Sequence, residues 1–168
     1  MAKVKGFLGR DYEMPEDRLY DGSRHLWLKK VAGGATVAVG VTAPGVALTG
    51  GLVELDVLAE PGAEIVLDEE VAFATTRKAI KYMLSPVAGK VEEANVGLLA
   101  EAVDGDPYGS WLFTISAAPG WEGRLLDAAA YAAKLARSEH ATDAASQAAK
   151  AGKGSPTCKS IYGGIKEG

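Results

Sequence analysis

Short runs in which apolar and polar residues alternate dominate the first two thirds of the chain. The clearest is ATVAVGV (35–41), which places Val37, Val39 and Val41 on one face. Alternation with a period of two is typical of a half-buried β-strand. Similar runs, separated by turns rich in glycine and proline, occupy residues 25–30, 51–58, 63–67, 71–76, 79–84, 89–94 and 111–116. The pattern predicts a mainly β domain of short antiparallel strands, with residues 25–30 and 35–41 forming a hairpin.

The spacing of apolar residues changes after Pro119. Residues 122–139 place leucine and alanine at helical intervals among good helix formers, which predicts an amphipathic helix against the β domain. Its expected buried positions are Leu125, Ala128, Ala129, Ala132, Leu135 and Ala136. We therefore predict a flattened β-barrel or sandwich with a C-terminal α-helix. In the strand at 51–58 the expected core residues are Val53, Leu55 and Val57.

Two segments flank the predicted domain. Residues 1–22 are polar without a clear period, and we interpret them as an N-terminal extension that lies over the domain or is partly disordered. The domain itself is expected at 23–139. Residues 140–168 are rich in Ala, Lys, Ser and Gly and contain Cys158, which predicts a flexible tail.

Composition and charge exclude several classes of protein. A net charge of −4 and a pI near 5.3 argue against a nucleic-acid-binding surface. The apolar runs are too short to span a membrane, and the N-terminus lacks a signal-peptide core. One cysteine and two distant histidines, His25 and His140, predict neither a disulfide framework nor a metal site. We expect a cytoplasmic protein.

One stretch, ATTRKAIKYMLSPVAG (74–89), stands out as a candidate site. It reads as a β-hairpin that presents Lys78 at its tip. An exposed amine in that position suits covalent modification better than pairing with a carboxylate. Arg77 makes the tip basic, which favours an electronegative partner surface.

The chain resembles the H protein of the glycine cleavage system, a member of the biotinyl/lipoyl carrier fold. The resemblance extends from residue 25 to about 131. The motifs that support it are His25-x-Trp27, ATVAVGVT (35–42), LVELDVL (52–58), Pro61-Gly62, Lys78-Ala79, Ser85-Pro86-Val87-x-Gly89, Asn95, Asp106-Pro107-Tyr108-Gly109 with Trp111-Leu112, and Leu125-Leu126 with Tyr131.

The resemblance implies that Lys78 bears lipoic acid in amide linkage. Lys78 precedes Pro86 by eight positions, as in the family, whereas Lys81 precedes it by five. The absence of methionines beside Lys78 favours lipoate over biotin. A lipoyl-lysine is a long tether that holds its dithiolane close to successive partner active sites. Such a protein is a carrier and not an enzyme, and the sequence shows no set of nucleophile, base and orienting residue.

Other residues are candidates for contact with the arm or with partners. They are Arg77, His25, Asp106 and Tyr108. For His25, packing and hydrogen bonding are a better explanation than proton transfer, and for Asp106 and Tyr108 a turn is an equal explanation. Cys158 could exchange with a lipoyl disulfide if its thiolate is accessible, although a lone tail cysteine is more often incidental.

Three departures from the family bear on the pathway. Thr75 stands where H proteins have a glutamate associated with recognition by lipoylating enzymes, Arg77 adds a charge, and the chain continues past the usual C-terminal helix. These differences favour a paralogue that serves heterodisulfide-reductase-like sulfur oxidation, with that complex as its partner. The alternative is a true H protein that serves glycine decarboxylase, aminomethyltransferase and dihydrolipoamide dehydrogenase. Both need a lipoate-attachment enzyme. A biotin carrier and an unmodified binding module remain as further alternatives.

Overall fold

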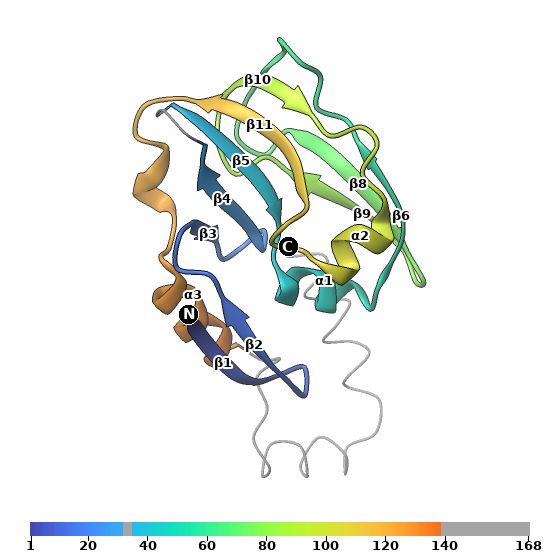
Figure 1. Cartoon of the computed structure of the whole chain (residues 1–168), viewed down its shortest axis with the longest axis vertical. Helices are drawn as coiled ribbons and strands as arrows, with labels where there is room; N and C mark the ends of the chain where they lie inside the picture. The colour runs from blue at the N-terminus through green and yellow to red at the C-terminus, as the bar shows by residue number, and fades with distance from the viewer. Residues whose placement is uncertain (32–34, 139–168) are drawn as a thin grey trace.

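A computed structural model describes residues 1–31 and 35–138 of the chain (Figure 1). The predicted tail at 140–168, with Cys158, lies outside the described residues. The strands are β1 (Ala2–Phe7), β2 (Arg10–Met14), β3 (Leu19–Asp21), β4 (Leu26–Lys30), β5 (Thr36–Val41), β6 (Leu52–Val57), β7 (Glu64–Ile65), β8 (Glu70–Thr76), β9 (Ile80–Leu84), β10 (Gly89–Ala94) and β11 (Trp111–Ala117). The helices are α1 (Ala43–Thr49), α2 (Ala100–Gly105), the 3₁₀ turn η1 (Trp121–Arg124) and α3 (Ala128–Ala136).

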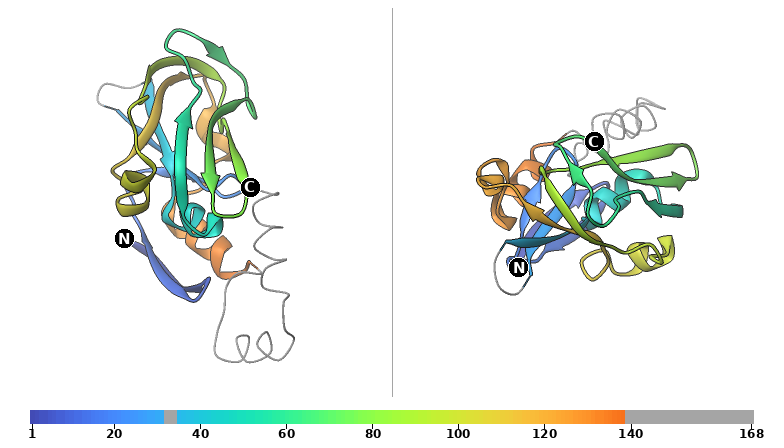
Figure 2. Two further views of the ribbon diagram at one scale, coloured as in Figure 1. Left: turned by 90° about the vertical axis from the view of Figure 1, so that its right-hand side faces the viewer. Right: turned by 90° about the horizontal axis from the view of Figure 1, so that it is seen from above.

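Two antiparallel sheets form the body of the domain, as the alternating pattern predicted. The larger has the order β3-β4-β5-β11-β10-β7, and the smaller has the order β6-β8-β9. Their inner faces enclose one apolar core, in which Val37, Val39 and Ile115 of the large sheet are fully buried with Val71 and Ala74 of the small one. The sheets face each other in Figure 2. Within the described residues no hydrogen-bonded strand pair joins them, so the fold is a sandwich and not a closed barrel.

The N-terminal residues form strands that the sequence pattern did not predict. β1 and β2 pair as a hairpin, and β3 is the edge strand of the large sheet. The hairpin packs against α3 around a second apolar core that includes Phe7, Met14 and Leu135. Alternation was hidden here because the hairpin contains a register shift between Val4 and Phe7. Left-handed backbone at Gly6, Leu8 and Gly9 accompanies that shift.

The C-terminal helix is shorter than the periodicity of residues 122–139 predicted. The Asp127 side chain accepts a hydrogen bond from Ala130 N (2.7 Å) and so sets the first turn at Ala128. Just before it, Leu126 exchanges two 2.8 Å backbone hydrogen bonds with Tyr20, which keeps this segment extended. Ala129 and Ala136 are exposed, and Tyr131 lies at the centre of the buried face instead.

In β6 as well, a residue that was predicted to be in the core is on the surface. Val53 is 56% exposed, whereas its neighbour Leu52 is buried. The pairing of β6 with β8 slips between Leu52 and Glu54, so that Val53 is the extra residue of a bulge. A bulge shifts the phase of alternation, and Leu55 and Val57 beyond it do pack against the core.

Candidate attachment site

The hairpin of β8 and β9 closes with a two-residue loop, Arg77-Lys78. Thr76 N donates a 2.8 Å hydrogen bond to Ala79 O, which defines the last rung of the hairpin. Neither Arg77 nor Lys78 has a positive φ, so the loop is not one of the primed turns that usually close such hairpins. The loop is stabilised in another way, by the side chain that precedes it.

The Thr76 hydroxyl organises this loop. It accepts hydrogen bonds from Ala79 N (3.1 Å) and Lys78 N (3.3 Å) and donates one to Ala79 O (3.0 Å). Thr76 itself is buried, with 6% of its surface exposed. A buried hydroxyl with three backbone partners therefore anchors the loop that bears Lys78. The sequence signal for it is small: a threonine directly before a two-residue turn.

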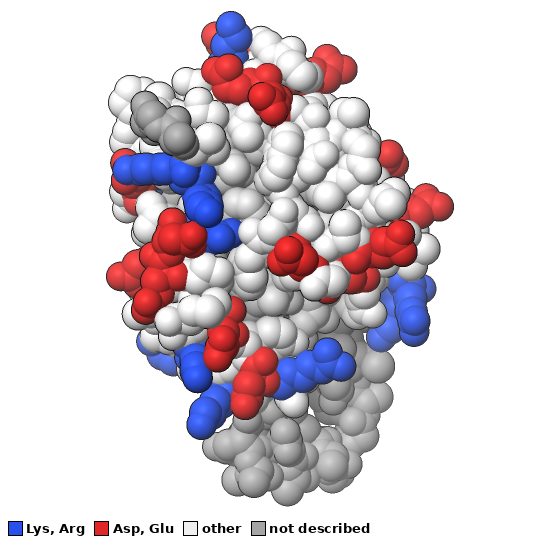
Figure 3. All heavy atoms as spheres, in the orientation of Figure 1, with Lys and Arg blue, Asp and Glu red and all other residues white. Residues whose placement is uncertain are grey.

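The environments of the two lysines in this hairpin are opposite. Lys78 and Arg77 are exposed at the closed end of the hairpin, at the periphery of the molecule (Figure 1). Figure 3 shows basic side chains at this end. Lys81 is on the inner side of β9 and is 7% exposed. Only the exposed side chain presents its amine to a modifying enzyme, so the structure favours Lys78 over Lys81.

Replacing Thr76 with valine is expected to loosen the loop. Valine keeps the shape but leaves two backbone amides without their acceptor, which should lower the free energy of unfolding by about 1–2 kcal/mol. Amide hydrogen exchange at Lys78 and Ala79 should accelerate at the same time. Thr75→Val is the matched control, because no hydrogen bond of the Thr75 hydroxyl is found among the described residues. Equal exchange rates in the two variants would contradict the anchoring role.

The buried lysine makes stability depend on pH. Burial lowers the pKa of Lys81 below its usual value, because desolvation disfavours the ammonium form. Between the folded-state and unfolded-state pKa values the unfolded chain binds more protons, so this group makes the free energy of unfolding rise with pH. We expect Lys81→Met to be more stable than the parent at pH 7, with the advantage shrinking as the pH rises through the folded-state pKa of Lys81 towards the ordinary lysine value. Urea midpoints measured across that range test it, and Lys90→Met, at an exposed site on β10, should show no such trend.

His25 and Tyr108 both have hydrogen-bond partners near the start of α1. His25 Nδ1 lies 2.8 Å from the hydroxyl of Tyr131, which is also 2.8 Å from Thr42 Oγ1. The Tyr108 hydroxyl accepts a 3.2 Å hydrogen bond from Ala43 N, and burial raises the pKa of Tyr108 to about 12. The Thr42 hydroxyl in turn caps α1 through Gly45 N (3.0 Å). These contacts assign His25 and Tyr108 to a polar network that positions α1.

The remaining predicted site residues are placed as follows. Asp106 is exposed at the end of α2, where its Oδ1 accepts a 3.1 Å hydrogen bond from Gly109 N and stabilises the turn. Cys158 is outside the described residues. In residues 1–31 and 35–138 no group of His, Cys, Asp and Glu is arranged to hold a metal ion. Across the same residues, none of the helices has the length and apolar character needed to cross a bilayer.

Comparison with known proteins places this geometry in a family. The family model described as glycine cleavage H-protein matches residues 18–138. The glycine cleavage system H protein of Escherichia coli O7:K1 (strain IAI39 / ExPEC) is 40% identical over 115 residues, which cover 66% of this chain and 88% of that protein. The counterpart from Beutenbergia cavernae is 36% identical over 123 residues, covering 71% and 94%.

A solved structure agrees with the sequence relatives. The crystal structure of a glycine cleavage system H protein from Mycobacterium marinum superposes with a TM-score of 0.62 at 28% sequence identity, covering 72% of this chain and 98% of that one. The region that matches the family model, residues 18–138, contains both sheets, the Lys78 loop and α3. The β1–β2 hairpin and the residues after 138 lie outside the family match. The chain belongs to the glycine cleavage H-protein family.

Proposed function

We propose that this protein is a lipoyl carrier of the glycine-cleavage type, with lipoic acid in amide linkage to Lys78. The observation that supports it most directly is an exposed lysine on an anchored two-residue hairpin loop, inside the region that matches the H-protein family. The site fits the group: the amine is at the surface for acylation, and the backbone beneath it is held by Thr76.

This geometry gives the protein and the cofactor separate roles. When attached, the lipoyl group supplies a dithiolane that accepts and releases both electrons and a one-carbon amine-bearing group. The protein supplies a rigid origin for the tether and a surface for docking. A fixed attachment point with a flexible arm maintains a high effective concentration of the dithiolane at each partner site. The chain is accordingly a non-catalytic carrier subunit, as its sequence predicted.

The comparisons favour glycine cleavage, which the sequence suggested as the alternative, over sulfur oxidation, which its departures from the family favoured. Each relative described above is named as a glycine cleavage system H protein, and none points to sulfur oxidation. We therefore infer that the partners are glycine decarboxylase, aminomethyltransferase, dihydrolipoamide dehydrogenase and a lipoate-attachment enzyme, acting in the cytoplasm. Thr75 stands in place of the glutamate that lipoylating enzymes of the family recognise. Of these partners, the attachment enzyme is therefore the one that we expect to differ most from its counterparts.

Intact mass of the protein purified from its own cells tests the proposal. We expect the increment of one lipoyl group, and we expect the purified protein to support the glycine–bicarbonate exchange reaction of glycine decarboxylase. An unmodified lysine in the native cell, or a biotin increment detected by avidin, would refute it. Protein made in another host is not a substitute, because a ligase that needs the missing glutamate would leave it unmodified.

A further inference from the structure

The outer face of the small sheet is partly apolar and lies beside the attachment loop. Two cross-strand rows form it, Glu54–Thr75–Ile80 next to the loop and Asp56–Phe73–Tyr82 behind it. We call these six residues the hairpin face. Ile80 is 58% exposed and Tyr82 is 48% exposed, and the rings of Phe73 and Tyr82 are in contact, with centroids 6.0 Å apart. Large apolar side chains gathered on one exposed face indicate an interaction surface.

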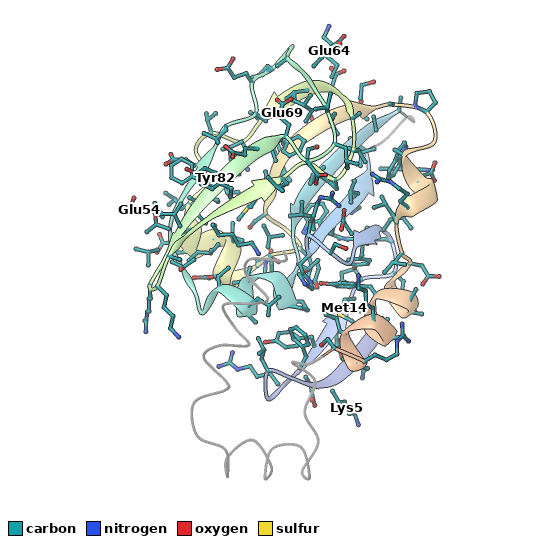
Figure 4. All side chains as sticks on the ribbon, turned by 180° about the vertical axis from the view of Figure 1, so that it is seen from behind. Lys5, Met14, Glu54, Glu64, Glu69 and Tyr82 are labelled. Carbon is teal, nitrogen blue, oxygen red and sulfur yellow. The ribbon has the colours of Figure 1, made fainter. Side chains whose placement is uncertain are left out.

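The hairpin face also has a charge pattern. Glu54 and Asp56 form its β6 side, and Figure 4 shows Glu54 and Tyr82 directed outward from the small sheet. No ion pair within the described residues involves either carboxylate. Acylation removes the positive charge of Lys78, so the loaded carrier presents Arg77 at the tip and two carboxylates along one side. A complementary surface has an apolar centre and basic residues opposite β6.

The position of the hairpin face beside the attachment loop indicates which kind of protein binds there. Ile80 follows Lys78 by two residues. Glu54 and Thr75 lie in the same cross-strand row as Ile80. Any enzyme that receives the arm must bring its active-site entrance to the loop. That approach brings protein against the hairpin face, because the arm is bound to one end of it. Contact there would lengthen the residence of the arm without new chemistry.

We propose that the hairpin face docks the arm-accepting enzyme, with an apolar patch of that enzyme on Ile80 and Tyr82 and basic side chains opposite Glu54 and Asp56. The inference rests on the proposed function and names the chemistry of the partner surface. Aromatic residues at the centre of an interface commonly dominate its affinity, so Tyr82 is the expected anchor. The carboxylates are expected to act on association and on its dependence on salt.

Steady-state kinetics with the lipoylated protein as the substrate of glycine decarboxylase test this surface. Tyr82→Ala should raise KM for the carrier about tenfold with kcat unchanged. Its control is Val96→Ala, at an 80% exposed valine outside the hairpin face. Rates are normalised to the lipoylated fraction measured by mass, so that a change in attachment does not count as a change in docking.

A charge reversal tests the second half of the proposal. Glu54→Lys with Asp56→Lys should raise KM and abolish the increase of KM with ionic strength that we expect for the parent. Glu92→Lys with Glu93→Lys makes the same change in net charge at two exposed positions of β10. This variant should leave KM and its dependence on ionic strength unchanged. A lower KM after reversal at Glu54 and Asp56 would mean an acidic partner surface and overturn the inference.

The remaining outcomes separate the two proposals. If the parent is lipoylated and accepted but the Tyr82 and Val96 variants behave alike, the docking inference fails and the proposed function stands. If the parent is unmodified or refused by the enzyme, both fail. Sedimentation of the parent identifies the competing occupant: a dimer that Tyr82→Ala dissociates would assign the face to a second copy of this chain and overturn the inference.

Discussion

Lys78→Arg is expected to abolish carrier function completely while leaving the fold intact. Arginine keeps the positive charge and much of the length of lysine, but its guanidinium is not an acceptor for lipoyl transfer. The loop should survive, because Thr76 binds the backbone of Lys78 and Ala79. The lipoyl mass increment should disappear, and glycine–bicarbonate exchange should fall to the background of glycine decarboxylase without a carrier.

Lys81→Met is the matched control for that loss. Lys81 lies three positions further along the same hairpin but is buried on the inner side of β9. This variant should keep the full increment and turn over at the parental rate. If the increment instead persists in Lys78→Arg and disappears in Lys81→Met, the assignment of the site is wrong. Equal unfolding midpoints for the parent and Lys78→Arg would show that the loss is chemical and not structural.

Gly40→Ala is expected to cause a large loss of stability, because the added methyl group has no room in the large sheet. A Cβ at Gly40 would overlap the indole of Trp27, its cross-strand neighbour on β4, and would lie 2.7 Å from Trp27 Nε1. Trp27 is 2% exposed, and its Nε1 donates a 3.0 Å hydrogen bond to Pro107 O. The ring therefore has little room to move, and overpacking of this kind should cost about 3 kcal/mol.

The displacement would spread to the residues packed on Trp27. Arg18 lies between two rings, 4.7 Å from the Trp27 centroid and 5.5 Å from that of Tyr108, and its Nη1 donates a 2.9 Å hydrogen bond to Tyr108 O. This cluster joins β4 and the residue just before β3 to the turn before β11. Urea unfolding followed by tryptophan fluorescence measures the cost. Gly97→Ala is the control, since a Cβ there meets no atom within 4 Å, and a loss as large in that variant would contradict the packing explanation.

Much of the site was predictable because its signals are local. Alternation marked both strands of the hairpin, and Lys78 lies between them at the interval from Pro86 that the family shows. The exposure of Lys78 follows from its place in a two-residue loop, which neighbouring strands cannot cover. Family membership was predictable for the same reason, because the Ser-Pro and Asp-Pro turns are short motifs whose residue types are set by backbone geometry.

The contrast between Lys81 and Val53 shows where local pattern fails. A lysine is expected outside and a valine inside, yet Lys81 is 7% exposed and Val53 is 56% exposed. Ile80 and Tyr82 occupy the outer positions of β9, so strict alternation turns Lys81 inward. Val53 is displaced by a bulge that exists only in the pairing of β6 with β8. The first outcome depends on which face of the β8–β9 hairpin is turned to the core, and the second on the register of β6 against β8.

The sequence by itself determined the mainly β class, the C-terminal helix, the H-protein resemblance and the identity of the exposed lysine, because each follows from periodicity or from turn residues. Tertiary structure alone decided the rest. It packed the β1–β2 hairpin on α3, paired β3 with β4, and set Ile80 and Tyr82 in the same face as Glu54 and Asp56. The physical reason is that these arrangements come from side chains that meet across strands or elements. No short window of sequence contains both partners.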